Sequence, residues 1–318
     1  MSEYTISPQE VEQFGRVAVI YGGLSSERTI SLKSASAVLA GLQRAGVNAF
    51  GIDLGGEDGQ ENPFIQLADA EFDRAFLILH GPGGEDGTLQ GALELLGKPY
   101  TGSGVAASAL GMDKVRCKQL WAGAGLPTPD YVIMNEATDP EQVGAQLGWP
   151  VFVKPAHEGS SIGITKAENV ASLRAAYQAA AALDDLVLAE RWMSGAEFTV
   201  GVLAGEALPV IKLETPHDFY DFNAKYEADD TRYEFKHGLT DVEEATLKQL
   251  VVDAFNVAGC SGWGRVDVMQ DGDGQFQLLE VNTAPGMTDH SLVPMAAAQH
   301  GISFEQLVVD ILRQTLNG

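Results

Sequence analysis

The first hundred residues alternate between apolar runs and helix-spaced apolar stripes, and this pattern constrains the fold more than any other. Residues 17–21 (VAVIY) form a continuous apolar run that ends in two glycines, which is typical of a buried parallel strand. A helical stripe over residues 32–42 follows, with Ser31 placed as its N-cap. A second run, residues 75–79 (AFLIL), precedes another such stripe. The alternation predicts a doubly wound parallel sheet whose loops at the carboxyl ends of the strands can bind a ligand.

The remaining sequence predicts further domains. A chain of 318 residues exceeds the size at which one hydrophobic core keeps growing. Near residue 103 the pattern changes to a Gly/Ala/Ser-rich helix and then a strand at residues 151–154, and from about residue 192 the chain is rich in strands. The fold class is therefore α/β, with an α+β C-terminal half. We predict three domains, which span residues 1–102, 103–191 and 192–318.

One segment of the last domain, residues 217–235, is polar and aromatic and too irregular for a core strand. A loop of this length in a compact domain is usually functional or disordered. We therefore treat it as a candidate functional loop.

Charge and composition exclude several classes of partner. The net charge of −24 repels nucleic-acid backbones and anionic membrane surfaces, so neither is an expected partner. No stretch approaches the roughly 18 apolar residues of a membrane span, and the polar N-terminus shows no signal peptide. The two cysteines, Cys117 and Cys260, form no disulfide framework. These features fit a cytoplasmic protein.

The most informative stretch is a predicted hairpin between residues 264 and 285. Two strands, GRVDVMQ and QFQLLEVN, flank the turn sequence DGDG. In either register that this turn allows, the polar side chains share one face. That face carries Arg265, Asp267, Glu280 and Asn282. The opposite face carries Val266, Val268, Leu279 and Val281, as a buried face should.

Two carboxylates this close indicate a cation between them. At about 4 Å, two like charges cost about 4 kcal/mol in a medium of effective dielectric about 20. Oxygen-only ligands favour Mg²⁺ over softer metals. The alternative is a surface network in which Arg265 pairs with Asp267 and Glu280. The rigid loop that follows, residues 282–288 (NTAPGMT), presents backbone amides beside these charges and favours a binding site.

A second candidate site follows the strand at residues 151–154. Lys154 precedes a Gly/Ser-rich loop (PAHEGSSIG), and such a loop can bind phosphate through backbone N–H groups, hydroxyls and one positive charge. The spacing is not that of a Walker A loop. The loop contains G-x-S-x-G around Ser161, but a hydrolase elbow must run directly into a helix, whereas residues 162–165 predict extended chain. A plain β-turn is the structural alternative.

The remaining motifs exclude other enzyme classes. The loop at residues 80–87 (HGPGGEDG) allows close backbone approach, although such loops are also structural. The loop after the first strand lacks G-x-G-x-x-G, which argues against a nicotinamide dehydrogenase. The histidines lack the spacing of a zinc site.

Together these segments resemble the D-alanine–D-alanine ligase family of the ATP-grasp fold, from about residue 16 to residue 316. The most specific pieces are HGPGGEDGTLQG at residues 80–91, and GWGRVDVM and LLEVNTAPGMT within residues 262–288. YTGSG, MDK, FYDFNAKY and HSLVP occur in the same order as in the family.

The resemblance implies where ATP and metal bind. Lys114 and Lys154 would contact the phosphates and Lys225 the γ-phosphate, while Glu190 and Glu197 would hold the nucleoside. Arg191 stands where relatives often have lysine, and the contact there is mostly with the backbone. The implied ligands of magnesium, or of manganese in its place, are Asp267, Glu280 and Asn282.

The resemblance also implies where the two D-alanine molecules bind. Glu27 would bind the ammonium of the first one, with Ser160 and Tyr226 as its hydrogen-bonding partners and His80 close by. Ser291 and the backbone of Leu292 would receive the carboxylate of the second. Arg265 and the amide of Gly286 would stabilise an oxyanion. The segment at residues 217–235 would be a lid that excludes water.

The implied reaction forms D-alanyl-D-alanine for peptidoglycan precursors through a D-alanyl phosphate, in a chain that is expected to be a homodimer. One alternative is a ligase of the same fold that uses D-lactate or D-serine, although Tyr226 favours an amine nucleophile. The other alternative is a non-catalytic ATP-binding module. The complete set of charged groups argues against that module.

Overall fold

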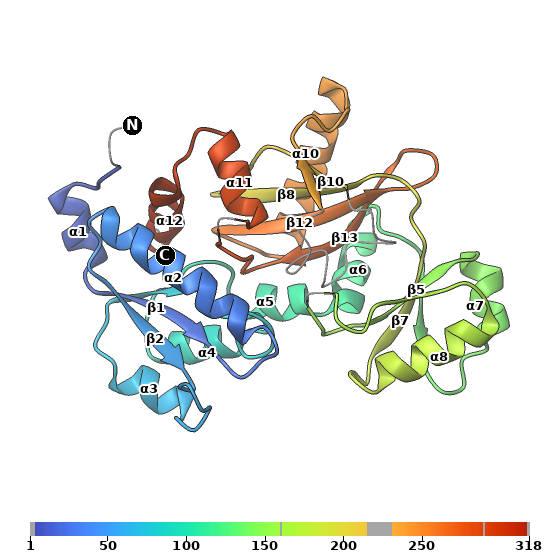
Figure 1. The fold of residues 1–318 in the computed structure, drawn as a ribbon, viewed down its shortest axis with the longest axis horizontal. Helices are drawn as coiled ribbons and strands as arrows, with labels where there is room; N and C mark the ends of the chain where they lie inside the picture. The colour runs from blue at the N-terminus through green and yellow to red at the C-terminus, as the bar shows by residue number, and fades with distance from the viewer. Residues whose placement is uncertain (1–3, 160, 215–230, 289, 317–318) are drawn as a thin grey trace.

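The residues that the structure describes form three β-sheets that follow one another along the chain. The structure, a computed structural model, describes residues 4–159, 161–214, 231–288 and 290–316. The N-terminal sheet and the sheet of residues 131–191 lie at opposite ends of the molecule, and the C-terminal sheet lies between them (Figure 1). No helix in these ranges is long and apolar enough to cross a membrane.

The N-terminal sheet is parallel, as the apolar runs predict, with strand order β2-β1-β3. Its strands are β1 (Val17–Gly22), β2 (Ala49–Leu54) and β3 (Arg74–Leu77). The helices of this region are α1 (Pro8–Phe14), α2 (Arg28–Arg44), α3 (Pro63–Asp69) and α4 (Thr88–Leu95).

The predicted N-cap of α2 is wrong. The helix begins at Arg28, with Glu27 at the N-cap position. Ser31 is fully buried one turn inside the helix. Its hydroxyl donates to the carbonyl of Ile78 at 2.7 Å and accepts from the amide of Gly22 at 2.9 Å. Ser31 therefore joins two strand ends rather than capping the helix, and the helix start moves forward so that Glu27 faces the loops.

The middle sheet is antiparallel, in the order β4-β7-β5-β6, and packs against α7 and α8. Its strands are β4 (Tyr131–Met134), β5 (Val151–Pro155), β6 (Thr165–Ala167) and β7 (Val187–Arg191). The helices here are α5 (Val105–Met112), α6 (Lys114–Gly123), α7 (Pro140–Leu147) and α8 (Val170–Ala181).

The C-terminal sheet runs β11-β10-β8-β12-β13, and β9 pairs with β8. Its strands are β8 (Glu197–Leu203), β9 (Glu206–Ala207), β10 (Ile211–Glu214), β11 (Arg232–Glu234), β12 (Trp263–Gln270) and β13 (Phe276–Asn282). The helices are α10 (Asp241–Val257), α11 (Leu292–Gln299) and α12 (Phe304–Arg313), followed by η1 (Gln314–Leu316). Helix α12 returns to pack on α2, so the two ends of the chain share one core (Figure 1).

The end of the predicted lid is an edge strand instead. Residues 232–234 form β11 and pair with β10, so the loop expected at residues 217–235 does not extend to 235. Residues 217–230 lie outside the described residues. Thr231 and Tyr233 contribute to the wall of the cavity described below.

On its polar residues the β12–β13 hairpin has one of the two registers that the sequence allows. Arg265 lies opposite Asn282, and Asp267 lies opposite Glu280. The register shifts after Asp267, so that Val268 pairs with Leu278 and Leu279 becomes an extra residue. Leu278 is fully buried in the core, whereas Leu279 is only half-buried. The prediction of Leu279 on the buried face is therefore wrong, because a β-bulge exchanges the two leucines.

Candidate active site

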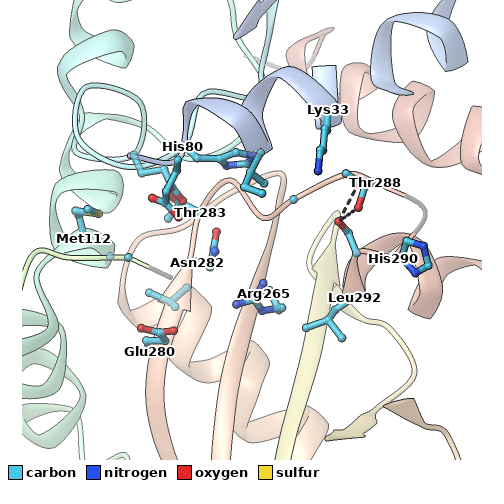
Figure 2. A pocket seen from close by; sticks show the side chains of 18 of the residues that line it. Lys33, His80, Met112, Arg265, Glu280, Asn282, Thr283, Thr288, His290 and Leu292 are labelled. Atoms are coloured by element: carbon cyan, nitrogen blue, oxygen red, sulfur yellow. Dashed lines mark hydrogen bonds between the residues drawn. The ribbon is translucent and has the colours of Figure 1, made fainter. Parts of the chain in front are cut away.

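A cavity of about 930 Å³ lies where the three sheets and their loops meet (Figure 2). Its wall is built from α2, the loop after β3, the α5–α6 junction, the glycine-rich loop after β5, and the β12–β13 hairpin with the loop that follows. Nine of the predicted site residues line it: Glu27, His80, Lys114, Arg265, Glu280, Asn282, Gly286, Ser291 and Leu292. Segments that are distant in the sequence therefore converge on one volume.

Arg265 holds one of the two hairpin carboxylates in a fork. Its Nε lies 2.9 Å from Oδ1 of Asp267 and its Nη2 lies 2.7 Å from Oδ2. The hydroxyl of Thr199 on β8 also donates to Oδ1 at 2.6 Å. The ion pair between Arg265 and Asp267, which the surface-network alternative predicts, is therefore present. Glu280 instead lies 3.6 Å from the ammonium of Lys114.

The hairpin face fits a hard divalent cation by its donor set. Two carboxylates and the Asn282 amide oxygen project from neighbouring positions of paired strands, and oxygen-only donors suit Mg²⁺. Lys114 approaches the same edge, so positive charge from the protein already faces Glu280. Among the described residues, no cluster of three histidine, cysteine or acidic side chains is arranged for a metal.

A buried ion triad joins α6 to the middle sheet. Glu190 on β7 is 1% exposed, and its carboxylate pairs with Lys154 of β5 and, at 2.5 Å, with Lys118 of α6. Burial alone would raise the pKa of Glu190, but the two ammonium groups outweigh it and hold the pKa below its usual range. Lys118 also donates to the hydroxyl of Thr128 at 2.8 Å. Lys154 and Glu190 stand together here, but outside the cavity wall.

Lys118 was not among the residues predicted from the sequence. The lysine follows Lys114 by one helical turn in MDKVRCK, so both side chains fall on the same side of α6. That spacing could have identified Lys118 as a second cation facing the same region. The other two predicted residues of this region are placed separately: Arg191 is exposed and pairs with Asp130 at 2.8 Å, and Glu197 begins β8.

Glu27 is enclosed by two glycine-containing loops. A Cβ at Gly81 would lie 2.8 Å from its carboxylate, and one at Gly159 would lie 2.9 Å away. Side chains at these two positions would collide with Glu27, so glycine permits the close approach. Glu27 itself is 8% exposed. It thus points from the start of α2 into the junction of the two loops.

The glycine-rich loop is not a hydrolase elbow. Ser161 has a positive φ of 60° and begins a turn that leads into β6 rather than a helix. Ser160, Lys225 and Tyr226 lie outside the described residues.

Two buried titratable groups face the cavity from the loop after β3. Burial lowers the pKa of His80 to about 4, so the ring is neutral. Its Nε2 has no hydrogen-bond partner among the described residues, and Figure 2 shows the ring beside the cavity. Burial and the neighbouring Glu27 carboxylate raise the pKa of Glu85 to about 8. The sequence reasoning did not select Glu85, although it belongs to the HGPGGEDG motif.

The far end of the cavity offers donors for an anion. The hydroxyl of Ser291 accepts from the amide of Thr288 at 2.9 Å instead of capping α11. The amide of Leu292 is at the first turn of that helix, where N–H groups have no partner within the helix. Lys33 of α2 faces the same region (Figure 2). This end therefore suits a carboxylate.

Two family descriptions match this chain. Residues 55–103 match the D-ala D-ala ligase N-terminus, and residues 120–313 match the D-ala D-ala ligase C-terminus. The chain belongs to the D-alanine–D-alanine ligase family. The resemblance of its motifs to that family, and the expected ATP-grasp fold, are confirmed.

Relatives cover the chain almost completely. D-alanine–D-alanine ligase of Ectopseudomonas mendocina is 57% identical over 311 residues, which cover 98% of this chain and 97% of the relative. The ligase of Marinobacter nauticus is 57% identical over 314 residues, which cover 98% and 95%. A solved D-alanine–D-alanine ligase from Bacillus anthracis has a TM-score of 0.84 at 33% identity and covers 95% of this chain and 97% of its own. A solved D-alanine–D-alanine ligase from Bacillus anthracis complexed with ATP has a TM-score of 0.83 at 30% identity, with coverage of 95% of this chain and 98% of its own.

Proposed function

We propose that this chain is an ATP-dependent ligase that joins two D-alanine molecules into D-alanyl-D-alanine for peptidoglycan precursors. The observation that carries the proposal is the single cavity in which Glu27, the polar hairpin face and the Ser291–Leu292 corner meet. These three features suit an ammonium group, a metal-bound polyphosphate and a carboxylate, respectively. The relatives that bear the ligase name, and the related structure complexed with ATP, support the same assignment.

ATP would bind between the middle and C-terminal sheets. Lys114 and Lys154 would contact its phosphates, with Lys225 at the γ-phosphate, while Glu190, Glu197 and the backbone at Arg191 would hold the nucleoside. Asp267, Glu280 and Asn282 would hold Mg²⁺, which when bound supplies positive charge against the terminal phosphates. The 3.6 Å approach of Lys114 to Glu280 supports a lysine beside the proposed metal ligands.

The two D-alanine molecules would occupy the cavity in a fixed order. Glu27 would bind the ammonium of the first molecule, with Ser160 and Tyr226 completing its contacts. His80 would donate or accept through its Nε2, which has no partner among the described residues. Ser291 and the amide of Leu292 would hold the carboxylate of the second molecule, because a helix N-terminus attracts negative charge.

The reaction would proceed in two transfers. A carboxylate oxygen of the first D-alanine attacks the γ-phosphorus of ATP, which forms a D-alanyl phosphate and releases ADP. The uncharged amine of the second D-alanine then attacks the acyl carbon, and the resulting tetrahedral intermediate expels phosphate. Arg265 and the amide of Gly286 would stabilise the oxyanion, and the side chains otherwise act by positioning.

The finer features of the family also belong to this proposal. We assign the three domains to residues 1–102, 103–191 and 192–318, with residues 217–231 as the lid. The chain would work in the cytoplasm as a homodimer. These assignments rest on the family resemblance and the positions of the three sheets.

One assay tests the proposal: phosphate release from MgATP with D-alanine alone, compared with D-alanine plus D-lactate or D-serine. We expect release with D-alanine alone, together with the dipeptide. Release only with an added hydroxy acid or D-serine would establish the alternative ligase. No release under any of these conditions would leave a non-catalytic ATP-binding module.

A further inference from the structure

His157, in the glycine-rich loop, is held between carboxylates from two different elements. Its Nε2 lies 3.1 Å from Oδ2 of Asp113, the N-cap residue of α6. Its Nδ1 lies 3.0 Å from Oδ2 of Asp184, in the turn before β7. The backbone amide of His157 also donates to that Asp184 oxygen at 2.7 Å. One side chain thus joins the loop, the start of α6 and the end of the α8–β7 connection.

Only the charged form of the ring satisfies both contacts. A neutral imidazole carries one N–H, so its other nitrogen would direct a lone pair at a carboxylate oxygen. The imidazolium donates to both carboxylates, and such charge-assisted hydrogen bonds are the stronger ones. Burial raises the pKa of Asp184, but hydrogen bonds from Leu186 and from His157 outweigh it and lower the pKa below its usual range. The carboxylate is therefore ionised and available to the ring.

Of the two contacts, the one with Asp184 depends more on the charge of the His157 ring. Arg116 of α6 pairs with the same Asp113 oxygen, so Asp113 keeps a cation when His157 is neutral. Among the described residues, Asp184 pairs with no lysine or arginine. The adjacent Glu158 adds negative charge, and Lys114 is the nearby cation that offsets it.

The residues beside His157 are the ones that lead into the phosphate-binding loop. The carbonyl of Ala156 accepts from the amide of Lys114 at 3.1 Å, and its amide donates to Leu186 at 2.9 Å. The carbonyl of Glu158 accepts from the ammonium of Lys114 at 2.6 Å. The His157 clamp therefore fixes the base of the loop and the position of Lys114 together.

We infer that His157, as an imidazolium between Asp113 and Asp184, is a positioning residue that sets the glycine-rich loop for the phosphates of ATP. This rests on the proposed function, because that function places the phosphates at the loop. When this clamp is broken, the loop adopts its binding-competent arrangement less often. A binding-competent fraction that falls to about a tenth weakens apparent affinity about tenfold.

The test compares three variants of the full-length chain with the wild type. His157→Gln keeps a hydrogen-bonding side chain without the charge, and His157→Arg keeps a charge at every pH. His300→Gln is the matched control, because His300 is an exposed histidine at the end of α11, outside the cavity wall. Calorimetry measures the Kd of MgATP and of adenosine at pH 6, and phosphate release gives kcat and KM.

We expect His157→Gln to raise the Kd of MgATP about tenfold above the wild-type value. His157→Arg should restore tight binding, whereas His300→Gln should follow the wild type. The Kd of adenosine, which lacks phosphates, and kcat at saturating ATP should stay within about threefold. Thermal denaturation confirms that each variant is folded.

Equal Kd values for MgATP in His157→Gln and the wild type at pH 6 would overturn the inference. If His157→Gln weakened adenosine binding as much as MgATP binding, the inference would also be overturned. A role in the phosphate loop predicts that only the ligand with phosphates binds more weakly. Failure of the proposed function would give a different result. The wild type would then release no phosphate with D-alanine, while the Kd values of MgATP would still test the role of His157.

Discussion

Replacing Arg265 separates an oxyanion role from a purely structural one. Its guanidinium makes two parallel hydrogen bonds with Asp267, and the two side chains are only 13% and 10% exposed. The arginine also lines the cavity beside Gly286. Arg265→Ala therefore removes both an oxyanion donor and the main partner of a nearly buried carboxylate.

The expected magnitudes differ for the two roles. Loss of one preorganised oxyanion donor costs about 3–4 kcal/mol, which lowers kcat about 10²- to 10³-fold. Leaving Asp267 with Thr199 as its remaining described donor lowers the free energy of unfolding by up to about 3 kcal/mol. ATP does not depend on the oxyanion donor, so its KM should change less than about fivefold.

The assay measures kcat, both KM values and thermal denaturation for Arg265→Ala, Arg265→Lys and Arg44→Ala. Lysine keeps the charge but cannot form the fork, so it should recover part of the stability and little of kcat. Arg44 forms an exposed ion pair with Glu305, so Arg44→Ala should change neither the stability nor kcat. A kcat within about threefold of wild type in Arg265→Ala, or a KM for ATP that rises as much as kcat falls, would refute the oxyanion role.

Two further changes test the metal site and the buried carboxylate near Glu27. Glu280→Gln removes one proposed metal ligand, so the Mg²⁺ concentration for half-maximal activity should rise, and an unchanged titration would place the metal elsewhere. Glu85 has a pKa raised from 4.5 to about 8, so the unfolded state loses its proton first and folding becomes less favourable as pH rises between these values. Glu85→Gln removes this cost, and its melting temperature relative to wild type should increase from about pH 5 to about pH 8; a constant difference would contradict the pKa shift.

The sequence was sufficient to predict which side chains share a face of a strand, because that depends only on alternation along the chain. That Asp267 and Glu280 share one face follows from the residue pattern alone, because a period of two keeps polar side chains together in either register. The bulge at Leu279 was not predictable, since one extra residue in a strand depends on how the core packs against Leu278. The loop between Gln270 and Phe276 has five residues and is longer than the predicted turn. The extra residue at the bulge compensates for this length, so that Asp267 still lies opposite Glu280.

Long-range partners of buried charges were not predictable. Lys118, Lys154 and Glu190 are on three elements, and nothing in their spacing shows that they meet. The same holds for Ser31, whose hydroxyl contacts two strands that the local helix pattern does not include. Local sequence signals determine elements and faces, whereas these contacts follow from how the elements pack.

The triad around Glu190 also explains why a second lysine accompanies Lys154. A buried carboxylate that loses its only cation is strongly destabilised, by about 3–5 kcal/mol. Lys154 would have to turn away from Glu190 to meet a phosphate, and Lys118, at 2.5 Å and 1% exposed, then remains as the counter-ion. Because Lys118 is also fixed by Thr128, its own position does not depend on Lys154. The Lys118–Glu190 pair would therefore allow Lys154 to contact ATP, as proposed, without leaving Glu190 unpaired.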